Sequence, residues 1–331
     1  MKLVVQIPAF NEEAILGRAI AALPRRVPGF SRVEVLVVDD GSADATEQVA
    51  RQAGADRVLR FSAHRGLAAA FSAGLEEALA MGADVIVNFD ADLQYDPADI
   101  PALVAPILAG RADLVLGDRG PGTLEHFSPG KRLLQRLGSW AVRQASGLRV
   151  RDATSGFRAL TREAARRVNV FSRMTYTLET LIQAGSKDLR VVSVPVRARP
   201  PARRSRLFTS VTRYVLVQGA NLLRITALYK PLKIFSAVAA LFLLAGTALG
   251  IRYLYFYATG RNPAGHVQSL ILGAVLIVVG VQTFLIALLA DLVAINRTLL
   301  EELKLKGRSS PLSAISSQPE KKETDAVVSD R

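Results

Sequence analysis

Two long apolar runs near the C-terminus constrain this 331-residue chain more than any other feature of its sequence. Ile234–Ile251 is a run of 18 residues without a charged side chain, and Val267–Ala290 is a run of 24. As helices they would be roughly 27 and 36 Å long, against about 30 Å for the hydrocarbon core of a bilayer. These lengths predict two transmembrane helices. The alternative, a hydrophobic helical hairpin in a soluble protein, is disfavoured by runs of this length.

The charges around the two runs predict their orientation. The short connection at 258–266 holds only Arg261 as a fixed charge. The outer flanks are rich in lysine and arginine, namely Arg224, Lys230, Lys233, Arg297, Lys304, Lys306 and Arg308. Because positively charged flanks stay on the cytoplasmic side, we expect a protein of the cell membrane with two spans. Its soluble part and both termini are then cytoplasmic, and the short connection lies outside.

This arrangement divides the chain into four parts. We expect a soluble domain at 1–208 and an amphipathic region at 209–231 that lies in the membrane interface. The two spans fall within 232–296. The tail at 297–331 is rich in serine, lysine, glutamate and proline towards its end, which is typical of disorder.

The soluble part has the pattern of an α/β domain with a mainly parallel sheet. Short runs of β-branched and apolar residues predict strands at 3–7, 33–38, 57–61, 85–89, 114–116 and 189–196. Helices are expected between them at 11–23, 66–81, near 133–145, from 176, and from Ser42 or Asp44, as capping residues, to about 54. Alternation of this kind places helices on the faces of a parallel sheet, a Rossmann-like arrangement.

Polar clusters follow four of the predicted strands. They are Pro8-Ala9-Phe10-Asn11-Glu12, Asp39-Asp40-Gly41-Ser42, Asp90-Ala91-Asp92 and Gly117-Asp118-Arg119. Ligands of such sheets bind beyond the carboxyl ends of the strands, so these clusters are expected to share one edge. Turn formation and helix capping are the simpler explanation of each cluster. Yet the carboxylates of these clusters would repel one another on one edge unless a cation or a positively charged group offsets them.

Asp90 and Asp92 are the candidate metal ligands. They stand one residue apart where a buried strand becomes a loop, so that both can reach one ion. Mg²⁺ and Mn²⁺ take oxygen ligands and complete their shells with substrate phosphates. An Asp-x-Asp pair is a weak signal by itself, because surface loops carry it often.

Basic residues point to an anionic partner. The net charge is +13, and 197–233 contains nine basic residues and no acidic one. Nucleic acid, a membrane surface and a phosphorylated substrate all fit that charge. The apolar runs that follow favour membrane lipid and exclude nucleic acid as the partner. The chain has no cysteine and only three scattered histidines, which excludes disulfides and disfavours a zinc site. No G-x-G-x-x-G follows the first strand and no P-loop motif occurs, which argues against a dinucleotide-dependent oxidoreductase and against a P-loop nucleotide-binding protein.

Five motifs in order resemble family 2 glycosyltransferases with a GT-A fold. They are Pro8-Ala9-Phe10-Asn11-Glu12, Val38-Asp39-Asp40-Gly41-Ser42, Asp90-Ala91-Asp92-Leu93-Gln94, Ser155-Gly156-Phe157-Arg158 and Ser205-Arg206-Leu207. The closest likeness is to the polyprenyl-phosphate glycosyltransferases, that is, dolichol-phosphate mannose synthase and bacterial members with two spans. The resemblance covers roughly 1–230. It implies inverting transfer of a hexose from a nucleoside diphosphate sugar to a polyprenyl phosphate, undecaprenyl or dolichyl, with Mg²⁺ or Mn²⁺.

The resemblance also implies residue roles on the donor side. Pro8, Phe10 and Glu12 match the first nucleotide-contacting loop, in which Phe10 stands where an aromatic hydroxyl is common. Asp39, with Asp40 beside it, matches the carboxylate that contacts base or ribose. The metal and diphosphate segment corresponds to Asp90, Ala91, Asp92 and Gln94. Arg119 matches a basic residue that contacts the donor.

On the acceptor side, Asp152 matches a carboxylate proposed as the general base of bacterial relatives. Arg206 matches a phosphate-holding lysine, and Arg158 is a further candidate for the acceptor phosphate. A family arginine falls on Pro200 here, so Arg199 or Arg203 substitutes, and Arg203 is the one we expect. Arg158 and Glu179 have simpler explanations, as an ion-pair partner and a helix N-terminal charge. His64 is expected to make a packing or loop contact.

Alternatives to this prediction remain. A nucleotidyltransferase would use the same two carboxylates but needs a glycine-rich basic loop after the first strand, which the chain lacks. A catalytically inactive membrane scaffold or flippase partner is disfavoured by the presence of Asp90, Asp92 and Arg206. A membrane glycosyltransferase with another lipid or glycan acceptor stays open. The sequence does not specify the sugar, among mannose, glucose and N-acetylhexosamine, or homo-oligomerisation.

Overall fold

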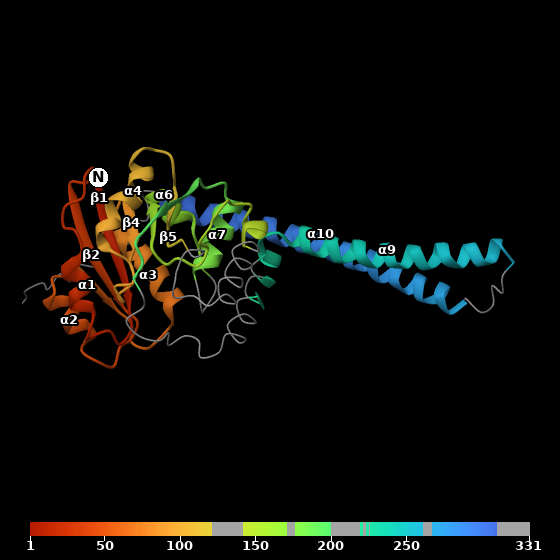
Figure 1. Ribbon diagram of the computed structural model, residues 1–331, viewed down its shortest axis with the longest axis horizontal. Coiled ribbons are helices and arrows are strands. Elements are labelled where there is room, and N and C mark those ends of the chain that lie inside the picture. The colour runs from red at the N-terminus through yellow and green to blue at the C-terminus, as the bar shows by residue number, and fades with distance from the viewer. Residues whose placement is uncertain are drawn as a thin grey trace, which may run out of the picture.

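The computed structural model describes residues 1–120, 142–170, 176–199, 219–220, 223–224, 226–260 and 267–309. An α/β domain and a long pair of helices form its two parts (Figure 1). The strands are β1 Lys2–Ala9, β2 Arg32–Asp39, β3 Arg57–Arg60, β4 Val85–Asn88, β5 Leu114–Asp118, β6 Arg158–Thr161 and β7 Val191–Pro195. The helices are α1 Leu16–Ala22, α2 Thr46–Gln52, α3 Leu67–Ala80, η1 Pro97–Asp99, α4 Ile100–Leu108, α6 Arg162–Arg167, α7 Thr177–Ser186, α9 Pro231–Ala258 and α10 Val267–Ser309.

The seven strands form one sheet in the order β3-β2-β1-β4-β6-β5-β7. All pairs are parallel except the two that β6 makes with β4 and β5. The predicted mainly parallel α/β sheet is therefore confirmed. The strand β6 was missed, because Arg158 was considered only as the last residue of the Ser155-Gly156-Phe157-Arg158 motif and the residues after it were not assigned. Its antiparallel insertion brings the Ser155–Phe157 segment beside the end of β4.

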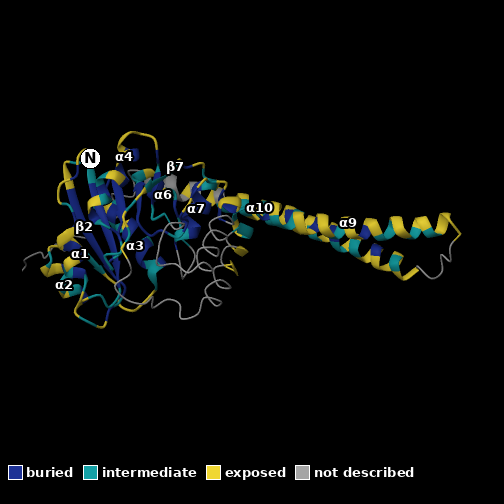
Figure 2. Ribbon diagram, viewed as in Figure 1, coloured by how far each residue is buried: buried dark blue, intermediate teal, exposed yellow. Residues whose placement is uncertain are grey.

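Both faces of the sheet are covered, which explains why its strands are apolar on both sides. Alternate residues of β1 point to opposite faces: Leu3 and Val5 pack with α1 and α4, whereas Val4 packs with α3 and α7. Figure 2 shows this buried core in dark blue beside the largely exposed helix pair. Buried strands of this kind hold their carboxyl ends rigidly at one edge, where the polar clusters lie.

The first helix begins later than predicted. We expected it from Asn11, but α1 starts at Leu16. Asn11 has a left-handed φ of 53°, which helical backbone does not allow, and its loop bonds to the loop after β2 instead. Most of the helix expected near 133–145 and of the interfacial region at 209–231 lies outside the described residues.

The apolar runs form α9 and α10, two helices long and apolar enough to cross a membrane. They pack closely through glycine: a Cβ at Gly246 would lie 2.7 Å from the carbonyl oxygen of Gly273. Small residues of this kind let helix backbones approach within a membrane. Helix α10 continues beyond Ala290, so the tail expected from 297 begins as helix. Its Arg297 guanidinium lies 4.0 Å from the ring centre of Tyr229, just before α9.

Candidate active site

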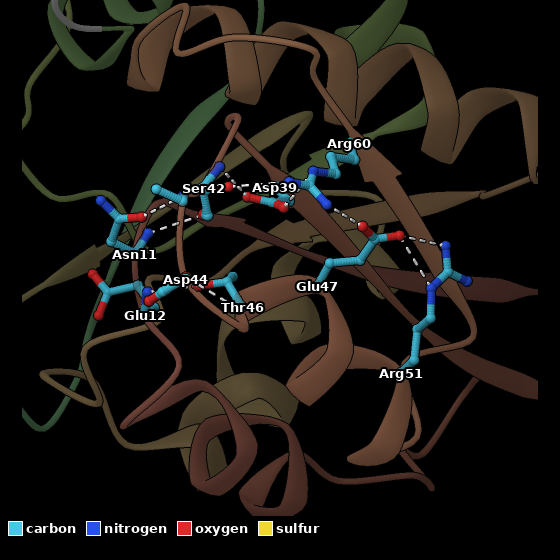
Figure 3. Close-up of polar contacts among 10 residues, drawn as sticks. Asn11, Glu12, Asp39, Ser42, Asp44, Thr46, Glu47, Arg51 and Arg60 are labelled. Carbon is cyan, nitrogen blue, oxygen red and sulfur yellow. Dashed lines mark hydrogen bonds and ion pairs between the residues drawn. The ribbon is translucent and has the colours of Figure 1, made fainter.

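The loops after β1 and β2 are joined by hydrogen bonds between side chains and backbone. Ser42 Oγ accepts from the Asn11 N–H at 2.9 Å, and Asn11 Oδ1 accepts from the Ala43 N–H at 2.9 Å (Figure 3). Ser42 was expected as a cap of the following helix, but the helix α2 has no side-chain cap bond. The hydroxyl is instead used to lock one loop of the sheet edge against the other.

The same two loops are tied a second time. Thr46 Oγ1 accepts from the Glu12 N–H at 2.8 Å, and Asp44 Oδ2 accepts from the Glu13 N–H at 3.2 Å. Glu13 returns a bond, because its carboxylate accepts from the Ala45 N–H at 2.9 Å. Burial alone would raise the pKa of Asp44, but its hydrogen bonds with Thr46 and Glu13 outweigh this and lower it. These polar residues shape the sheet edge.

Asp39 is the carboxylate of this edge with an available oxygen. Its side chain is fully buried, and Oδ1 accepts from the Ser42 N–H at 3.0 Å. Oδ2 has no hydrogen-bond partner among the described residues, and Arg60 Nε lies 3.5 Å away. Arg60 in turn pairs with Glu47, whose pKa is lowered by hydrogen bonds from Arg51 and Arg60 (Figure 3). Asp39 Oδ2 is thus a buried acceptor suited to a ligand N–H or O–H.

Asp40 uses both oxygens on backbone. Oδ1 accepts from the Arg65 N–H at 2.7 Å and Oδ2 from the Gly66 N–H at 2.9 Å, just before α3. His64 Nδ1 lies 3.0 Å from the same Oδ2, and the His64 ring stacks on Phe10 with centroids 4.0 Å apart. The loop contact expected of His64 is therefore present. Phe10 and His64 form an aromatic pair at the edge where a nucleotide is expected.

The end of β4 carries Asp90 and Asp92. Asp92 Oδ1 accepts from the Gln94 N–H at 3.0 Å across Leu93, whose φ of 56° makes the turn tight. Asp90 has no hydrogen bond to a described residue. Burial, followed by the charge of Asp92, raises the pKa of Asp90 to about 7, and the charges of Arg119 and Arg158 offset this only in part.

This pair fits a divalent cation. Among the described residues no three carboxylates or histidines converge as a protein-only metal site. Mg²⁺ and Mn²⁺ do not need one, because one or two carboxylates and substrate phosphates can complete the shell. A cation would relieve the repulsion that raises the pKa of Asp90. The predicted ligands Asp90, Asp92 and Gln94 lie together on one turn.

A buried polar network lies beneath Asp90. Gln6 Nε2 donates to Asn88 Oδ1 at 2.9 Å, and Asn88 Nδ2 donates to both the Gly156 carbonyl and the Tyr176 hydroxyl at 2.9 Å. A Cβ at Gly156 would lie 2.5 Å from Asp90 Oδ2 and 2.9 Å from the Tyr176 hydroxyl. Gly156 is therefore required sterically where the Asp90 carboxylate meets the start of β6.

Sequence reasoning missed this network, although a signal was present. Gln6 and Asn88 are fully buried polar residues inside apolar strands, and they are register partners across β1 and β4. Tyr95 was missed as well. Its hydroxyl lies 3.2 Å from Ser155 Oγ and accepts from the Gly156 N–H at 3.2 Å.

Arg119 and Asp152 form a buried ion pair. Arg119 Nε donates to Asp152 Oδ2 at 2.6 Å, and Nη2 donates to Oδ1 at 3.0 Å and to Thr154 Oγ1 at 2.9 Å. The guanidinium also lies 5.9 Å from the ring centre of Tyr95. Burial by itself would raise the pKa of Asp152, but the hydrogen bonds and charge of Arg119 lower it overall.

Arg158 lies deeper than a surface phosphate site requires. It is fully buried, Nε donates to the Ser155 carbonyl at 2.8 Å, and Nη2 donates to the Ala153 carbonyl at 3.2 Å. Nη1 donates to Thr180 Oγ1. Burial lowers its pKa, although the charges of Asp152 and Asp90 oppose that shift. Arg158 thus holds the 153–155 loop, and its contact with an acceptor phosphate stays a prediction.

The segment after β7 is bonded to the metal loop. Arg199 N donates to the Gln94 carbonyl at 2.8 Å, and Tyr95 forms an antiparallel bridge with Ala198. Arg197 pairs with Asp99 at 2.8 Å. The start of the 197–233 belt therefore lies against residues 94–99, which directly follow the Asp90–Asp92 turn. The predicted phosphate contacts Arg203 and Arg206, like Pro200, lie outside the described residues.

A mostly parallel sheet with carboxylates beyond the carboxyl ends of its strands, among them an Asp-x-Asp turn, is the arrangement of the GT-A fold. The chain belongs to glycosyl transferase family 2, whose model matches residues 4–168. The predicted family and the prediction of an enzyme are thereby confirmed. What the family membership does not specify is the sugar.

Three similar proteins illustrate this. The polyprenol monophosphomannose synthase of Mycolicibacterium smegmatis is 32% identical over 207 residues, covering 58% of this chain and 75% of that protein. The UDP-N-acetylglucosamine–dolichyl-phosphate N-acetylglucosaminyltransferase of Methanococcus voltae is 26% identical over 238 residues, covering 66% and 89%. Among solved structures, glucosyl-3-phosphoglycerate synthase from Mycobacterium tuberculosis, in complex with Mn²⁺, UDP-glucose and phosphoglyceric acid, has a TM-score of 0.53 and 26% identity, covering 68% and 80%.

Proposed function

We propose that this protein transfers a hexose from a nucleoside diphosphate sugar to a polyprenyl phosphate at the cytoplasmic face of the cell membrane. The configuration at the anomeric carbon inverts, because the acceptor phosphate attacks opposite the leaving diphosphate. The named relatives support a polyprenyl carrier, and the two apolar helices support a membrane location. Mannose, glucose and N-acetylhexosamine remain the candidate sugars.

The observation that carries the proposal is the pairing between the loop after β4, at 90–95, and the segment after β7, at 197–199. The bond from Arg199 N to the Gln94 carbonyl and the bridge between Tyr95 and Ala198 bring the start of the basic belt to the residues that directly follow the Asp90–Asp92 turn. A soluble acceptor could reach the site without a chain segment that joins it to the membrane. A lipid phosphate needs such a segment, because its charged group stays at headgroup level and the transferase site must be held there.

On the donor side, the open Oδ2 of Asp39 would accept a hydrogen bond from the base or ribose, beside Phe10. Asp90, Asp92 and Gln94 would hold Mg²⁺ or Mn²⁺, which when bound offsets the charge that develops on the leaving diphosphate. Arg119 would add a fixed positive charge from the other side of Asp90. Pro8, Glu12, Asp40 and Ala91 would then shape the walls of this donor site.

On the acceptor side, the nucleophile is a phosphate oxygen that is already ionised at neutral pH. Chemistry of this kind depends on positioning and charge more than on removal of a proton. Arg203, or Arg199 in its place, and Arg206 would hold the acceptor phosphate in line with the anomeric carbon. The interfacial region at 209–231 would keep them at the membrane surface.

The proposal is tested with the full-length protein in liposomes. Undecaprenyl or dolichyl phosphate is supplied with Mn²⁺ and, one at a time, radiolabelled GDP-mannose, UDP-glucose and UDP-N-acetylglucosamine. We expect a lipid-extractable labelled product with one donor, and no product from an Asp92→Ala protein. A parallel arm with 3-phosphoglycerate tests a soluble phosphate acceptor. Label transfer only to that acceptor, or to none with any donor, would refute the proposal.

A further inference from the structure

The ion pair between Arg119 and Asp152 leaves little of either side chain free. Both oxygens of Asp152 accept from Arg119, at 2.6 and 3.0 Å, and Oδ1 also accepts from Thr154 Oγ1 at 3.0 Å. The Asp152 side chain is 1% exposed and that of Arg119 is 12% exposed. A bidentate pair of this geometry fixes the plane and direction of the guanidinium.

The guanidinium has one edge left for a ligand. Of its five N–H groups, the one on Nε and the two on Nη2 are donated to Asp152 and Thr154. The two N–H groups of Nη1 have no partner among the described residues. The ring of Tyr95 lies beneath the group, and the charge of Asp90 acts on it from the metal loop. The Nη1 edge is therefore a preformed donor pair beside the site for phosphate.

The same geometry makes Asp152 a poor proton acceptor. A general base needs an oxygen within reach of the substrate, whereas both oxygens of Asp152 face Arg119 and the side chain is only 1% exposed. Two charged groups, Arg119 and Arg158, interact with Asp152, and because both are positive they favour its ionised form. A carboxylate stabilised in this way binds a proton weakly at neutral pH.

We propose that Asp152 is a positioning residue, which holds Arg119 so that its Nη1 edge binds a phosphate oxygen of the substrate, and that it accepts no proton in the reaction. This inference rests on the proposed function and deepens it. The phosphate belongs either to the donor diphosphate or to the lipid acceptor. Both present the same oxygens to Arg119, and the experiment separates them.

The test compares the activities of Asp152→Asn, Arg119→Ala and the double variant in the liposome assay. Asp152→Glu, which keeps the carboxylate, is measured beside them. Thermal melting of every variant controls for folding. We expect kcat/KM to fall about 10²-fold in each single variant and hardly further in the double variant. The pH profile of the remaining activity keeps its shape in Asp152→Asn. If Asp152 accepted the proton, the losses in kcat/KM of the two single variants would add in the double variant. The pH profile of Asp152→Asn would also lose its acidic limb. These results would overturn the inference.

Chemical rescue distinguishes positioning of Arg119 by Asp152 from a purely structural role of Asp152. Added guanidinium ion restores activity to Arg119→Ala, because Asp152 still offers a bidentate partner, and it restores none to the double variant. Equal rescue of both proteins contradicts the inference. The KM of the nucleotide sugar rises if Arg119 contacts the donor, and the KM of the polyprenyl phosphate rises if it contacts the acceptor.

Binding measurements separate this inference from the proposed function. With Mn²⁺ present, the affinities for inorganic pyrophosphate and for a short-chain polyprenyl phosphate are measured on the same variants by calorimetry. We expect one of the two to weaken by the same factor in both single variants and in the double variant. Unchanged affinity for both ligands overturns the inference, whereas an inactive parent protein that shows this pattern overturns only the proposed function.

Discussion

The carboxylates at the ends of β1 and β2 differ from those at the end of β4 in what their oxygens contact. Asp40 and Asp44 accept from backbone N–H groups, and the loop after β2 that carries both is bonded to the loop after β1. Asp90 makes no such bond to a described residue, and its pKa is raised to about 7. Carboxylates of the first kind build the edge of the sheet. Asp92 accepts one backbone N–H, from Gln94, but Asp90 is held without one at a cost, which a cation and phosphates would offset.

The largest expected effect tests that division directly. Asp92→Ala removes one carboxylate of the Asp90–Asp92 pair, and we expect transferase activity to fall about 10³-fold. Asp44→Asn is the matched control, because it alters a bonded carboxylate on the other rim, and its activity should stay within a few-fold of the parent. Initial rates with saturating Mn²⁺ measure both. Equal losses of activity in the two variants would show that the carboxylates after β2 and those after β4 do not differ in function.

Gly156→Ala sharpens the comparison without changing any charge. The new Cβ would lie 2.5 Å from Asp90 Oδ2, so either the carboxylate or the start of β6 must shift. We expect kcat to fall about 10²-fold and the Mn²⁺ requirement to rise, since displacement by about 1 Å is enough for such a loss. Gly219→Ala, at a position with no atom within 4 Å of its Cβ, is the control. Unchanged Mn²⁺ dependence would argue against Asp90 as a ligand.

Ser42→Ala tests the hydrogen bonds that join the loops after β1 and β2. It leaves the Asn11 N–H without its acceptor in a part-buried place, so we expect the soluble domain to lose about 1 kcal/mol of stability. The kcat/KM of the folded protein should change less than threefold. Differential scanning fluorimetry in detergent and initial rates provide the two readings. A loss of activity as large as that of Asp92→Ala would place Ser42 in the site itself.

The smallest effect concerns a carboxylate far from either rim. Hydrogen bonds from Arg190 lower the pKa of Asp113, against the opposing effect of burial, so the pair contributes stability above pH 4 and loses it as the pH falls through the lowered pKa. Asp113→Asn should lower the melting temperature by about one degree at pH 7. The difference should vanish in acid. Glu163→Gln, within an exposed pair on α6, serves as the control. A difference that grows in acid would contradict the sign.

Much of the fold was predictable because it depends on local patterns. Short apolar runs identified β1, β2, β3, β4, β5 and β7, and polar clusters marked the ends of four of these six strands. The strand β6 was not identified, since four residues bounded by a motif give too short a signal. The start of α1 was placed too early, because acidic residues after Asn11 favour a helix locally, whereas the tertiary bonds to Ser42 and Thr46 do not permit one.

The candidate site was predictable in its members but not in their roles. Motif order identified Asp39, Asp90, Asp92 and Arg119, and all of them lie at the carboxyl edge of the sheet. Asp152 was expected to accept a proton. Its pairing with Arg119, 33 residues away in the sequence, turns both of its oxygens towards that guanidinium. Arg158 was expected at the acceptor phosphate; it is buried against the 153–155 loop, and its contact with that phosphate stays a prediction.

The sequence by itself determined the class of the protein. Two charge-free runs of membrane length, a strand-helix alternation and an Asp-x-Asp turn are local features, so each can be recognised without knowing what it contacts. Only the tertiary structure decided which charged side chains are available to a ligand. That availability depends on whether a backbone N–H or an opposite charge from a distant segment already occupies each oxygen, and no local pattern encodes which distant segment arrives.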